Sequence, residues 1–438
     1  MILFTAVALV GVAVFVLLVH HPRFVPHIAL SAIVVLAAMI PRFGPSDEHV
    51  VVLTAGSAAI GLVALLRRPP HEAGQYVGLN RLLLAYLVYS SAIAIVFLTP
   101  SAAALRAVTT VALILVVLLA RRTSAATTDY FPVLLACIVF AEVAFGVSEA
   151  FLGADAVWPR PDGSDRLEGR VNHIAPWLAG RVLGTFAGPI PYGTVAGVAF
   201  LAALWMVIER GRRRYVWVLA VAAFGLLLSG TRSAILAIVL MVVMWLLVRS
   251  SASRPVIVCV GLLAGAALLL LSDVGALFGL QGFTDSTSYE HRTQILGSIT
   301  DLLTKQSPLA VIFGNGDNAR DLLVDGTITT TTGVTVFDNQ LVRELAASGI
   351  VGTTLLIAGM VTALRRGNGL SRMVVIFVGL MFLSFDALTW QSVSVLFLIA
   401  CASPLAVKQQ LEAASAPSRR PRARAASGAR LDRSPSAS

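Results

Sequence analysis

The sequence predicts an all-α protein that crosses a membrane many times, and three observations support this fold class. The 438-residue chain is 57% hydrophobic and only 13% charged, and its mean hydropathy is +0.84. Soluble domains carry about 25% charged residues. Long apolar runs recur along most of the chain, and basic residues gather in the short segments between them. Lipid is therefore the expected main solvent of this chain.

The spanning helices can be placed by the length that a bilayer imposes. A helix needs about 20 apolar residues to cross the hydrocarbon core, with a usual range of about 17–25. On this criterion we expect about 12–13 transmembrane helices within a domain of residues 1–406. The expected spans lie near residues 2–19, 25–40, 49–66, 82–99, 102–120, 131–152, 190–208, 215–230, 232–248, 255–272, 342–364, 372–387 and 390–406. Residues 2–19 lack a basic n-region and a cleavage site, so they predict a retained helix rather than a signal peptide.

The basic loops indicate the orientation of these helices. All of the basic clusters between spans fall on one side if the N-terminus is outside, and that side is then the cytoplasm. The clusters contain Arg67, Arg68, Arg81, Arg121, Arg122, Arg210, Arg212, Arg213, Arg214, Arg249, Arg254, Arg365, Arg366 and Arg372. The tail 407–438 is rich in Ser, Ala, Pro and Arg, which predicts a disordered basic cytoplasmic segment. The basic loops that orient the protein in the membrane thus account for the net charge of +10, which does not indicate a nucleic-acid partner.

Two long polar loops are expected on the extracytoplasmic side, at residues 153–189 and 273–341. Loops of this length in compact proteins are usually functional or disordered. The second loop contains Thr287-Ser-Tyr-Glu290, which has the form of a capping box. The apolar residues that follow on one helical face are Ile295, Ile299, Leu302 and Leu303. The pattern predicts an amphipathic helix that lies on the membrane surface or roofs a cavity.

Metal and cofactor chemistry have little support in the sequence. Cys137, Cys259 and Cys401 each lie inside an apolar run, so we expect small buried hydrophobes rather than disulfides or ligands. The extracytoplasmic loops carry no D-x-D pair, and the chain has no H-E-x-x-H or C-x-x-C motif. The segment Gly314-Asn-Gly316 is too short for a phosphate loop and predicts a turn. No metal and no cofactor are therefore expected.

Four polar features on the extracytoplasmic side are candidates for chemistry. They are Arg181 in segment 181–189, Arg232 in 229–234, Arg292 in 290–292, and segment 337–341 followed by Glu344 and 348–352. An arginine at membrane depth costs several kcal/mol unless it is paired, so Arg232 indicates a functional site by default. Guanidinium groups match phosphate oxygens in bidentate geometry. Three arginines at one membrane face would suit a lipid-linked pyrophosphate.

Each arginine also has a structural interpretation. Arg181 can serve as an interfacial anchor. Arg232 can form a salt bridge with Glu142 or Asp386. Arg292 can be a solvated loop residue.

Asp338 and the two loop histidines have structural interpretations as well. Asp338 is well suited to cap the N-terminus of the helix that follows it, and local sequence favours that role. His173 and His291 are single loop histidines, for which a surface position is more common than catalysis.

Taken in order, these motifs resemble the O-antigen ligase and polymerase superfamily of bacterial envelope enzymes. An Arg-x-x-Gly-x-Phe-x-x-Pro segment at 181–189 is followed by Ser-Gly-Thr-Arg-Ser at 229–233, which opens a membrane helix. A large loop then carries an Arg-containing helix and the turn Phe313-Gly-Asn-Gly316. The loop ends in an aromatic-x-Asn motif that leads into Glu-x-x-x-Ser-Gly-Ile-x-Gly. The resemblance covers about residues 130–365 and rests on the order of the motifs.

The resemblance implies a metal-independent, inverting glycosyltransferase of GT-C-like fold, either a ligase or a polymerase. Such enzymes are multi-pass proteins of the bacterial inner membrane with an extracytoplasmic active site. They transfer a glycan from undecaprenyl pyrophosphate, or another polyprenyl pyrophosphate, to an acceptor sugar during cell-envelope polysaccharide assembly. The implied partners are this donor, a glycan or glycolipid acceptor and the lipid bilayer.

The resemblance also implies roles for individual residues. Arg181, Arg232 and Arg292 match the family arginines that hold or polarise the pyrophosphate, and Arg232 and Arg292 would act in catalysis by neutralising its charge. Ligases of the family usually show His-Asn where this chain has Asp338-Asn339, and that histidine is the proposed general base. A carboxylate can abstract the same proton, so Asp338 is the implied catalytic base and ligase and polymerase both stay open. The residues expected to support the acceptor are Asn339, His291 and Glu290.

Two functions of other classes stay open on the sequence. One is a transporter or flippase for an anionic lipid-linked glycan, but the sequence shows no internal repeat of the kind that transporters often have. The other is a membrane scaffold of a polysaccharide assembly complex, with the long loops as docking surfaces.

Overall fold

The structure is a computed structural model in which every regular element is helical. It describes residues 24–40, 47–67, 80–123, 130–155, 157, 171–178, 180–186, 188–249, 294–324, 328, 337–367 and 369–402. Within these ranges no strand occurs, and five helices are long and apolar enough to cross a membrane. The predicted all-α polytopic membrane fold is confirmed.

The apolar helices lie at the predicted spans, but the span predicted at 372–387 is wrong at its end, because α17 stops at Met381. They are α2 (Val25–Ala38), α3 (Asp47–Leu66), α4 (Arg81–Val96), α5 (Pro100–Arg122), α6 (Tyr130–Leu152), α7 (Pro189–Ile208), α8 (Tyr215–Ser229), α9 (Arg232–Arg249), α16 (Gln340–Arg366), α17 (Gly369–Met381) and α18 (Gln391–Ala402). The spans predicted at 2–19 and 255–272, and the tail 407–438, lie outside the described residues.

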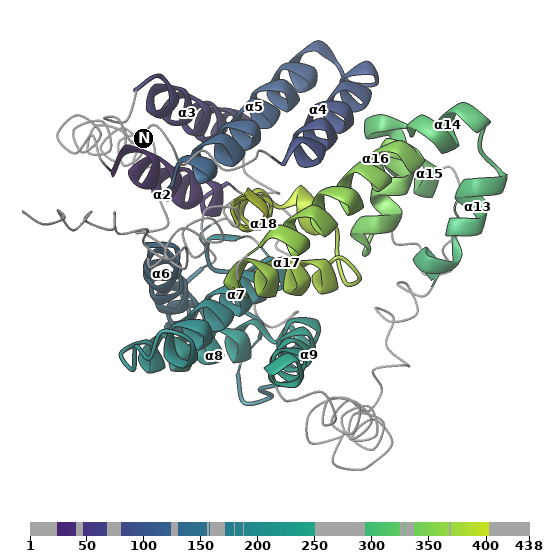
Figure 1. Cartoon of the computed structure of the whole chain (residues 1–438). Helices are drawn as coiled ribbons and strands as arrows, with labels where there is room; N and C mark the ends of the chain where they lie inside the picture. Colours follow the sequence, from purple (N-terminus) through teal and green to yellow (C-terminus); the bar gives the residue numbers. More distant parts are fainter. Residues whose placement is uncertain are drawn as a thin grey trace, which may run out of the picture.

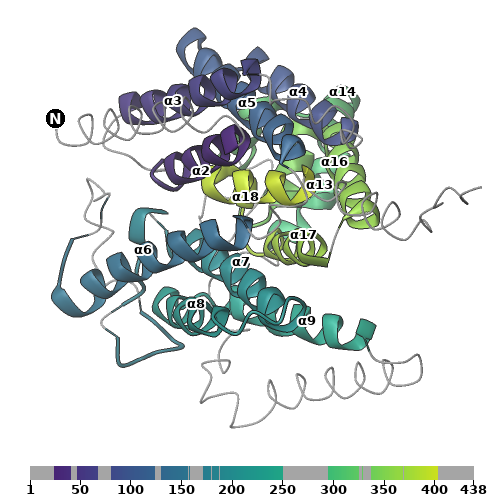
Figure 2. The ribbon, with the colours of Figure 1, turned by 60° about the vertical axis from the view of Figure 1, so that its left-hand side comes forward.

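The membrane helices form two groups with α17 and α18 between them. Helices α2, α3, α4 and α5 gather on one side, and α6, α7, α8 and α9 gather on the other (Figures 1 and 2). Helix α17 packs on α7 and α9, while α18 packs on α2 and α5. The approach of α17 to α7 is close, because a Cβ at Gly197 would lie 2.4 Å from the ring of Phe377. Small residues let membrane helices approach each other in this way.

The connection between α17 and α18 is largely buried inside the molecule, although Leu383 in it is 49% exposed. It contains the short helix η6 (Ala387–Thr389), and Phe385, Asp386 and Ala387 are at most 3% exposed. Helix α17 has only 13 residues, which corresponds to a length of about 20 Å. A hydrocarbon core is about 30 Å thick, so this helix is too short to span it. The connection therefore lies within the bundle rather than beyond its end.

The described residues that precede α16, from 294 to 324 and at 328 and 337, form short helices around a small core of their own. The helices are α13 (Ile299–Thr304), α14 (Pro308–Phe313), η5 (Gly316–Arg320) and α15 (Asp321–Val324). The core consists of Ile295, Leu302, Ala319, Leu323, Ile328, Phe337, Val342 and Ala346. The last two belong to α16, so the loop is packed onto the start of that membrane helix.

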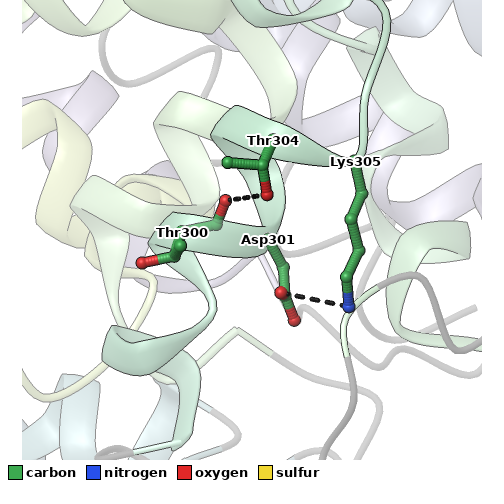
Figure 3. Close-up of polar contacts among 4 residues, drawn as sticks. All are labelled: Thr300, Asp301, Thr304 and Lys305. Carbon is green, nitrogen blue, oxygen red and sulfur yellow. Dashed lines mark hydrogen bonds and ion pairs between the residues drawn. The ribbon is translucent and has the colours of Figure 1, made fainter.

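The amphipathic helix predicted in this loop is only partly correct. Ile295 and Leu302 are buried and Ile299 packs against them, but Leu303 is 45% exposed. Helical hydrogen bonds continue across Ser298, from its N–H to Gln294 O and from the N–H of Leu302 to Ser298 O, both at 2.9 Å, so Leu303 lies at the exposed edge of the apolar face. The polar side of α13 carries an Asp301–Lys305 ion pair at 3.0 Å (Figure 3). The predicted capping box at 287–290 lies outside the described residues.

Helix α16 is broken at Gly349, where the loop is attached to it. Gly349 has φ 64° and ψ −167°, so the helical hydrogen-bond pattern is interrupted there. The carbonyl of Ala346 instead accepts from Asn315 in the turn Phe313–Gly316. Gly314 and Gly316 have positive φ, which confirms the predicted turn. A Cβ at Gly314 would lie 2.2 Å from the carbonyl oxygen of Ala347, so the turn sits directly in the break.

Candidate functional site

The C-terminal end of α8 is capped by the loop that precedes α7. The last carbonyls of a helix need partners outside it. Asn172 donates its side-chain amide to Leu227 O at 2.8 Å, and Val182 donates its backbone N–H to Leu228 O at 3.2 Å. Gly230 ends the helix with φ 59°, the left-handed conformation that commonly terminates helices. The loop is therefore held at the turn between α8 and α9.

Arg181 is bound to this same turn through its guanidinium group. Its Nε donates to the carbonyl of Ser229 at 2.8 Å, and one terminal nitrogen donates to Thr231 Oγ1 at 3.3 Å. The Thr231 hydroxyl in turn donates to Pro189 O at 2.8 Å. Arg181 is thus fixed against Thr231, the residue that directly precedes Arg232. We call Arg181, Thr231 and Arg232 the arginine corner.

Arg232 is the first residue of α9, and both it and Arg181 are half-buried. A helix N-terminus carries partial positive charge, so a cation there is unfavourable and an anion is favourable. Glu142 and Asp386 were the two predicted salt-bridge partners of Arg232, and Glu142 is bound to the loop before α7. Glu142 accepts hydrogen bonds from the backbone and the hydroxyl of Thr185, at 3.0 and 2.5 Å. The N-terminus of α9 is therefore a place where an anion would be favoured, with Arg181 bound to the residue directly before it.

Asn339, and not Asp338, caps the N-terminus of α16. Its Oδ1 accepts from the backbone N–H groups of Leu341 at 2.9 Å and Val342 at 3.1 Å. The expectation that Asp338 fills this role is wrong, because the helix begins one residue later than the local pattern suggests. Asp338 is half-buried and lies just ahead of the helix. Asn339 is 1% exposed, which indicates a structural role in shaping the chain beside Asp338.

The buried connection between α17 and α18 joins the start of α16 to the arginine corner. Gln340 donates its backbone N–H to Phe382 O and accepts from the N–H of Leu388, both at 2.8 Å. At the other end of the connection, Trp390 packs so closely on Gly188 that a Cβ there would lie 2.8 Å from the ring. Gly188 directly precedes α7, whose first carbonyl binds the arginine corner.

A buried polar cluster beside this region was not predicted as a site. Glu344 on α16 is 3% exposed, and its Oε2 accepts from the Tyr86 hydroxyl at 2.9 Å and from Gln340 Nε2 at 3.2 Å. The Arg106 guanidinium on α5 interacts electrostatically with Glu344. In the sequence, Glu344 stands out only as the first residue of the Glu-x-x-x-Ser-Gly-Ile-x-Gly motif. An arginine inside the apolar run of α5 was the signal that could have indicated the cluster.

The remaining predicted residues are placed as follows. Arg292, His291 and Glu290 lie outside the described residues. His173 is exposed, as expected for a surface histidine.

Two of the cysteines can be checked against the expectation of burial. Cys401 is buried, as expected. Cys137 is exposed on α6, so the expectation of burial is wrong for it. Cys259 lies outside the described residues.

Fold and site together define an α-helical multi-pass membrane protein with a cationic corner beside a buried helix connection. Residues 217–357 match the family model described as O-antigen ligase, and this match supports the O-antigen ligase and polymerase superfamily indicated by the motifs. The matched segment runs from α8 through α16, so it contains Arg232 and Asp338 but begins after Arg181. A comparison with curated proteins finds no match. The family supports ligase- or polymerase-like glycosyltransferase activity in general.

Proposed function

We propose that this protein transfers a glycan from a polyprenyl-pyrophosphate donor to an acceptor sugar on the extracytoplasmic side of a bacterial inner membrane. The observation that carries the proposal is the arginine corner, in which Arg181 is hydrogen-bonded to Thr231 directly before Arg232. The O-antigen ligase match over residues 217–357 supports a transferase rather than a transporter.

The arginine corner suits a pyrophosphate leaving group. Negative charge grows on the phosphate oxygen as its bond to the anomeric carbon of the sugar breaks. Guanidinium groups held in place beforehand stabilise such charge without reorganising during the reaction. Arg181 meets this condition, because its bonds to Ser229 and Thr231 fix it in advance. Arg292 is the third arginine that we assign to the donor.

Asp338 is the group that we assign as general base. It would take the proton of the acceptor hydroxyl while that oxygen attacks the anomeric carbon and the pyrophosphate leaves with the bonding electron pair. One displacement of this kind inverts the anomeric configuration. Since Asn339 caps α16, the Asp338 carboxylate is not needed for that structural task. A general base typically contributes about 10²–10⁴-fold to the rate.

The proposal is tested by glycan transfer in proteoliposomes. The donor is a polyprenyl-pyrophosphate-linked glycan extracted from membranes of the source cell, and the product is followed by mass spectrometry. Arg232→Ala should abolish transfer, while Arg232→Lys should retain part of it because the charge remains. Arg212→Ala, in the basic turn between α7 and α8, is the matched control and should keep full turnover. Unchanged turnover of Arg232→Ala would overturn the role, and lipid scrambling without transfer would favour a flippase.

A further inference from the structure

Helix α6 carries two buried glutamates that face the loop of Arg181. Glu142 and Glu149 are 5% and 2% exposed, and they lie seven residues apart, which places them on one face two turns apart. Carboxylates within membrane helices are rare and expensive, so each needs compensating partners. These two find their partners in the backbone of a single loop segment.

The carboxylates bind three successive backbone N–H groups. Glu149 accepts from the N–H of Leu183 with one oxygen and from that of Gly184 with the other, both at 2.9 Å. Glu142 accepts from the N–H of Thr185 at 3.0 Å and from its hydroxyl at 2.5 Å. The segment that follows Arg181 is therefore attached firmly to α6.

Gly184 makes this arrangement possible. Its φ of 56° is left-handed, and a Cβ at this position would lie 2.3 Å from Glu142 Oε2. Any other residue would thus displace the carboxylate. Phe186 closes the segment by packing edge-on against Tyr192, whose hydroxyl donates to Glu142 O at 3.1 Å. The Gly and Phe of the Arg-x-x-Gly-x-Phe pattern therefore serve the contact with α6.

Val182 is the single residue between segment 183–185, which is bound to α6, and Arg181, which is bound to the turn between α8 and α9. Its own N–H is bound to Leu228 O at 3.2 Å. The direction in which Arg181 leaves the backbone is consequently set from both sides, and a shift of segment 183–185 would move its guanidinium. Displacements of about 1 Å in a catalytic site can cost about 10²-fold in rate.

We propose that Glu142 and Glu149 are positioning residues that hold Arg181 in place for the pyrophosphate. This inference rests on the proposed function, because it takes Arg181 as a pyrophosphate ligand. The two glutamates do not touch the donor themselves. They act through the backbone of segment 183–185.

The test is a double-mutant cycle on donor affinity. The probe is undecaprenyl pyrophosphate, titrated against the full chain in nanodiscs. Glu149→Gln leaves one good acceptor oxygen for the two N–H groups of Leu183 and Gly184. The affinity for undecaprenyl pyrophosphate should therefore fall about 10-fold, close to the fall for Arg181→Ala. The double variant should bind no more weakly than Arg181→Ala alone, because the glutamate acts only through that arginine. Glu209→Gln, exposed after α7, is the matched control and should bind as wild type.

Two further measurements separate positioning from general stability. Thr185→Val removes the hydroxyl bonds to Glu142 and to Ala38 O at nearly constant volume, and it should weaken binding in the same direction but less. In transfer assays, Glu149→Gln should raise KM for the donor and leave KM for the acceptor unchanged. Additive losses in the double variant would overturn the inference while leaving the proposed function intact. A wild-type protein that does not bind the probe would overturn both.

Discussion

Asn315 donates two hydrogen bonds to the carbonyl oxygen of Ala346, from its backbone N–H at 2.9 Å and from its side-chain amide at 3.1 Å. The break at Gly349 leaves that carbonyl outside the regular helical pattern, and membrane helices tolerate such breaks when other groups supply the missing bonds. The loop between α9 and α16 is thereby attached to the helix whose start carries Asp338. The resemblance also assigns a pyrophosphate arginine, Arg292, to this loop.

The first prediction concerns the break itself. Gly349→Ala should destabilise the protein strongly, because φ is 64° and the new Cβ would lie 2.4 Å from Ile312 O. Gly153→Ala is the matched control: φ is 66° there, but nothing lies within 4 Å of the added Cβ. The control should show only the left-handed backbone cost of about 1–2 kcal/mol. Thermal unfolding in detergent measures both, and equal shifts would show that the docked turn does not constrain Gly349.

The second prediction separates Asp338 from its neighbour. Asp338→Asn should lower glycan transfer by about 10²–10⁴-fold, the usual contribution of a general base. The melting temperature of the same variant, measured beside the transfer rate, separates a loss of catalysis from a loss of stability. Asn339→Ala should instead destabilise the protein by about 1 kcal/mol through loss of the cap. Full transfer by Asp338→Asn would remove the base from the mechanism and favour a scaffold.

The contrast between these two residues shows which parts of the protein the sequence could predict. Hydrophobic length placed the apolar helices, because a bilayer imposes one length on every span, but only five of the described helices reach that length. Local patterns failed where tertiary contacts decide the outcome. Leu303, predicted on the buried face, is exposed, and Asn339 rather than Asp338 caps α16 because the helix starts one residue later. The spacing of apolar residues along the sequence predicts neither outcome.

The hydrogen-bond partners of the site residues lie far apart in the sequence, so local patterns cannot identify them. Tyr86 and Glu344 are hydrogen-bonded across 258 positions, and Glu149 meets Gly184 across 35. Only the order of motifs brought Arg181 and Arg232 into one hypothesis before their contact through Thr231 was known. Order along a chain can indicate which residues belong together, but it does not identify the buried carboxylates that hold them.

The third prediction concerns the apolar surface of α14. Leu309, Ile312 and Phe313 are 69%, 42% and 44% exposed, and no residue of this helix is buried. The neighbouring α4 exposes Phe97, which contacts Gly316 of the adjoining turn. A continuous apolar surface of this kind fits lipid, so we expect α14 to lie in the outer leaflet.

Brominated lipids can test this placement, because bromine quenches tryptophan fluorescence at short range. Leu309→Trp should add emission that lipid brominated in the acyl chain quenches, relative to the wild-type background. Thr304→Trp, on the exposed side of α13, is the control and should add emission that the lipid leaves unquenched. Equal quenching at the two positions would contradict the placement.

The fourth prediction compares two tyrosines on one helix. Tyr86 is buried and its hydroxyl donates to the Glu344 carboxylate at 2.9 Å, whereas the exposed Tyr89 bond to Phe313 O is 3.0 Å long. Tyr86→Phe removes one of the two hydrogen bonds that Glu344 receives, and its other oxygen has no partner among the described residues. An undersatisfied buried carboxylate costs about 1–3 kcal/mol or more.

Tyr86→Phe should therefore lower the free energy of unfolding clearly more than Tyr89→Phe, which loses only a neutral bond in an exposed position. Both variants remove a single hydroxyl group from α4, so differences in helix propensity and volume cancel. Unfolding in mixed micelles, followed by circular dichroism, gives the comparison. A Glu344→Gln background should shrink the effect of Tyr86→Phe, because the neutral amide needs the hydroxyl less. An effect of equal size in that background would show that the charge of Glu344 does not account for the bond.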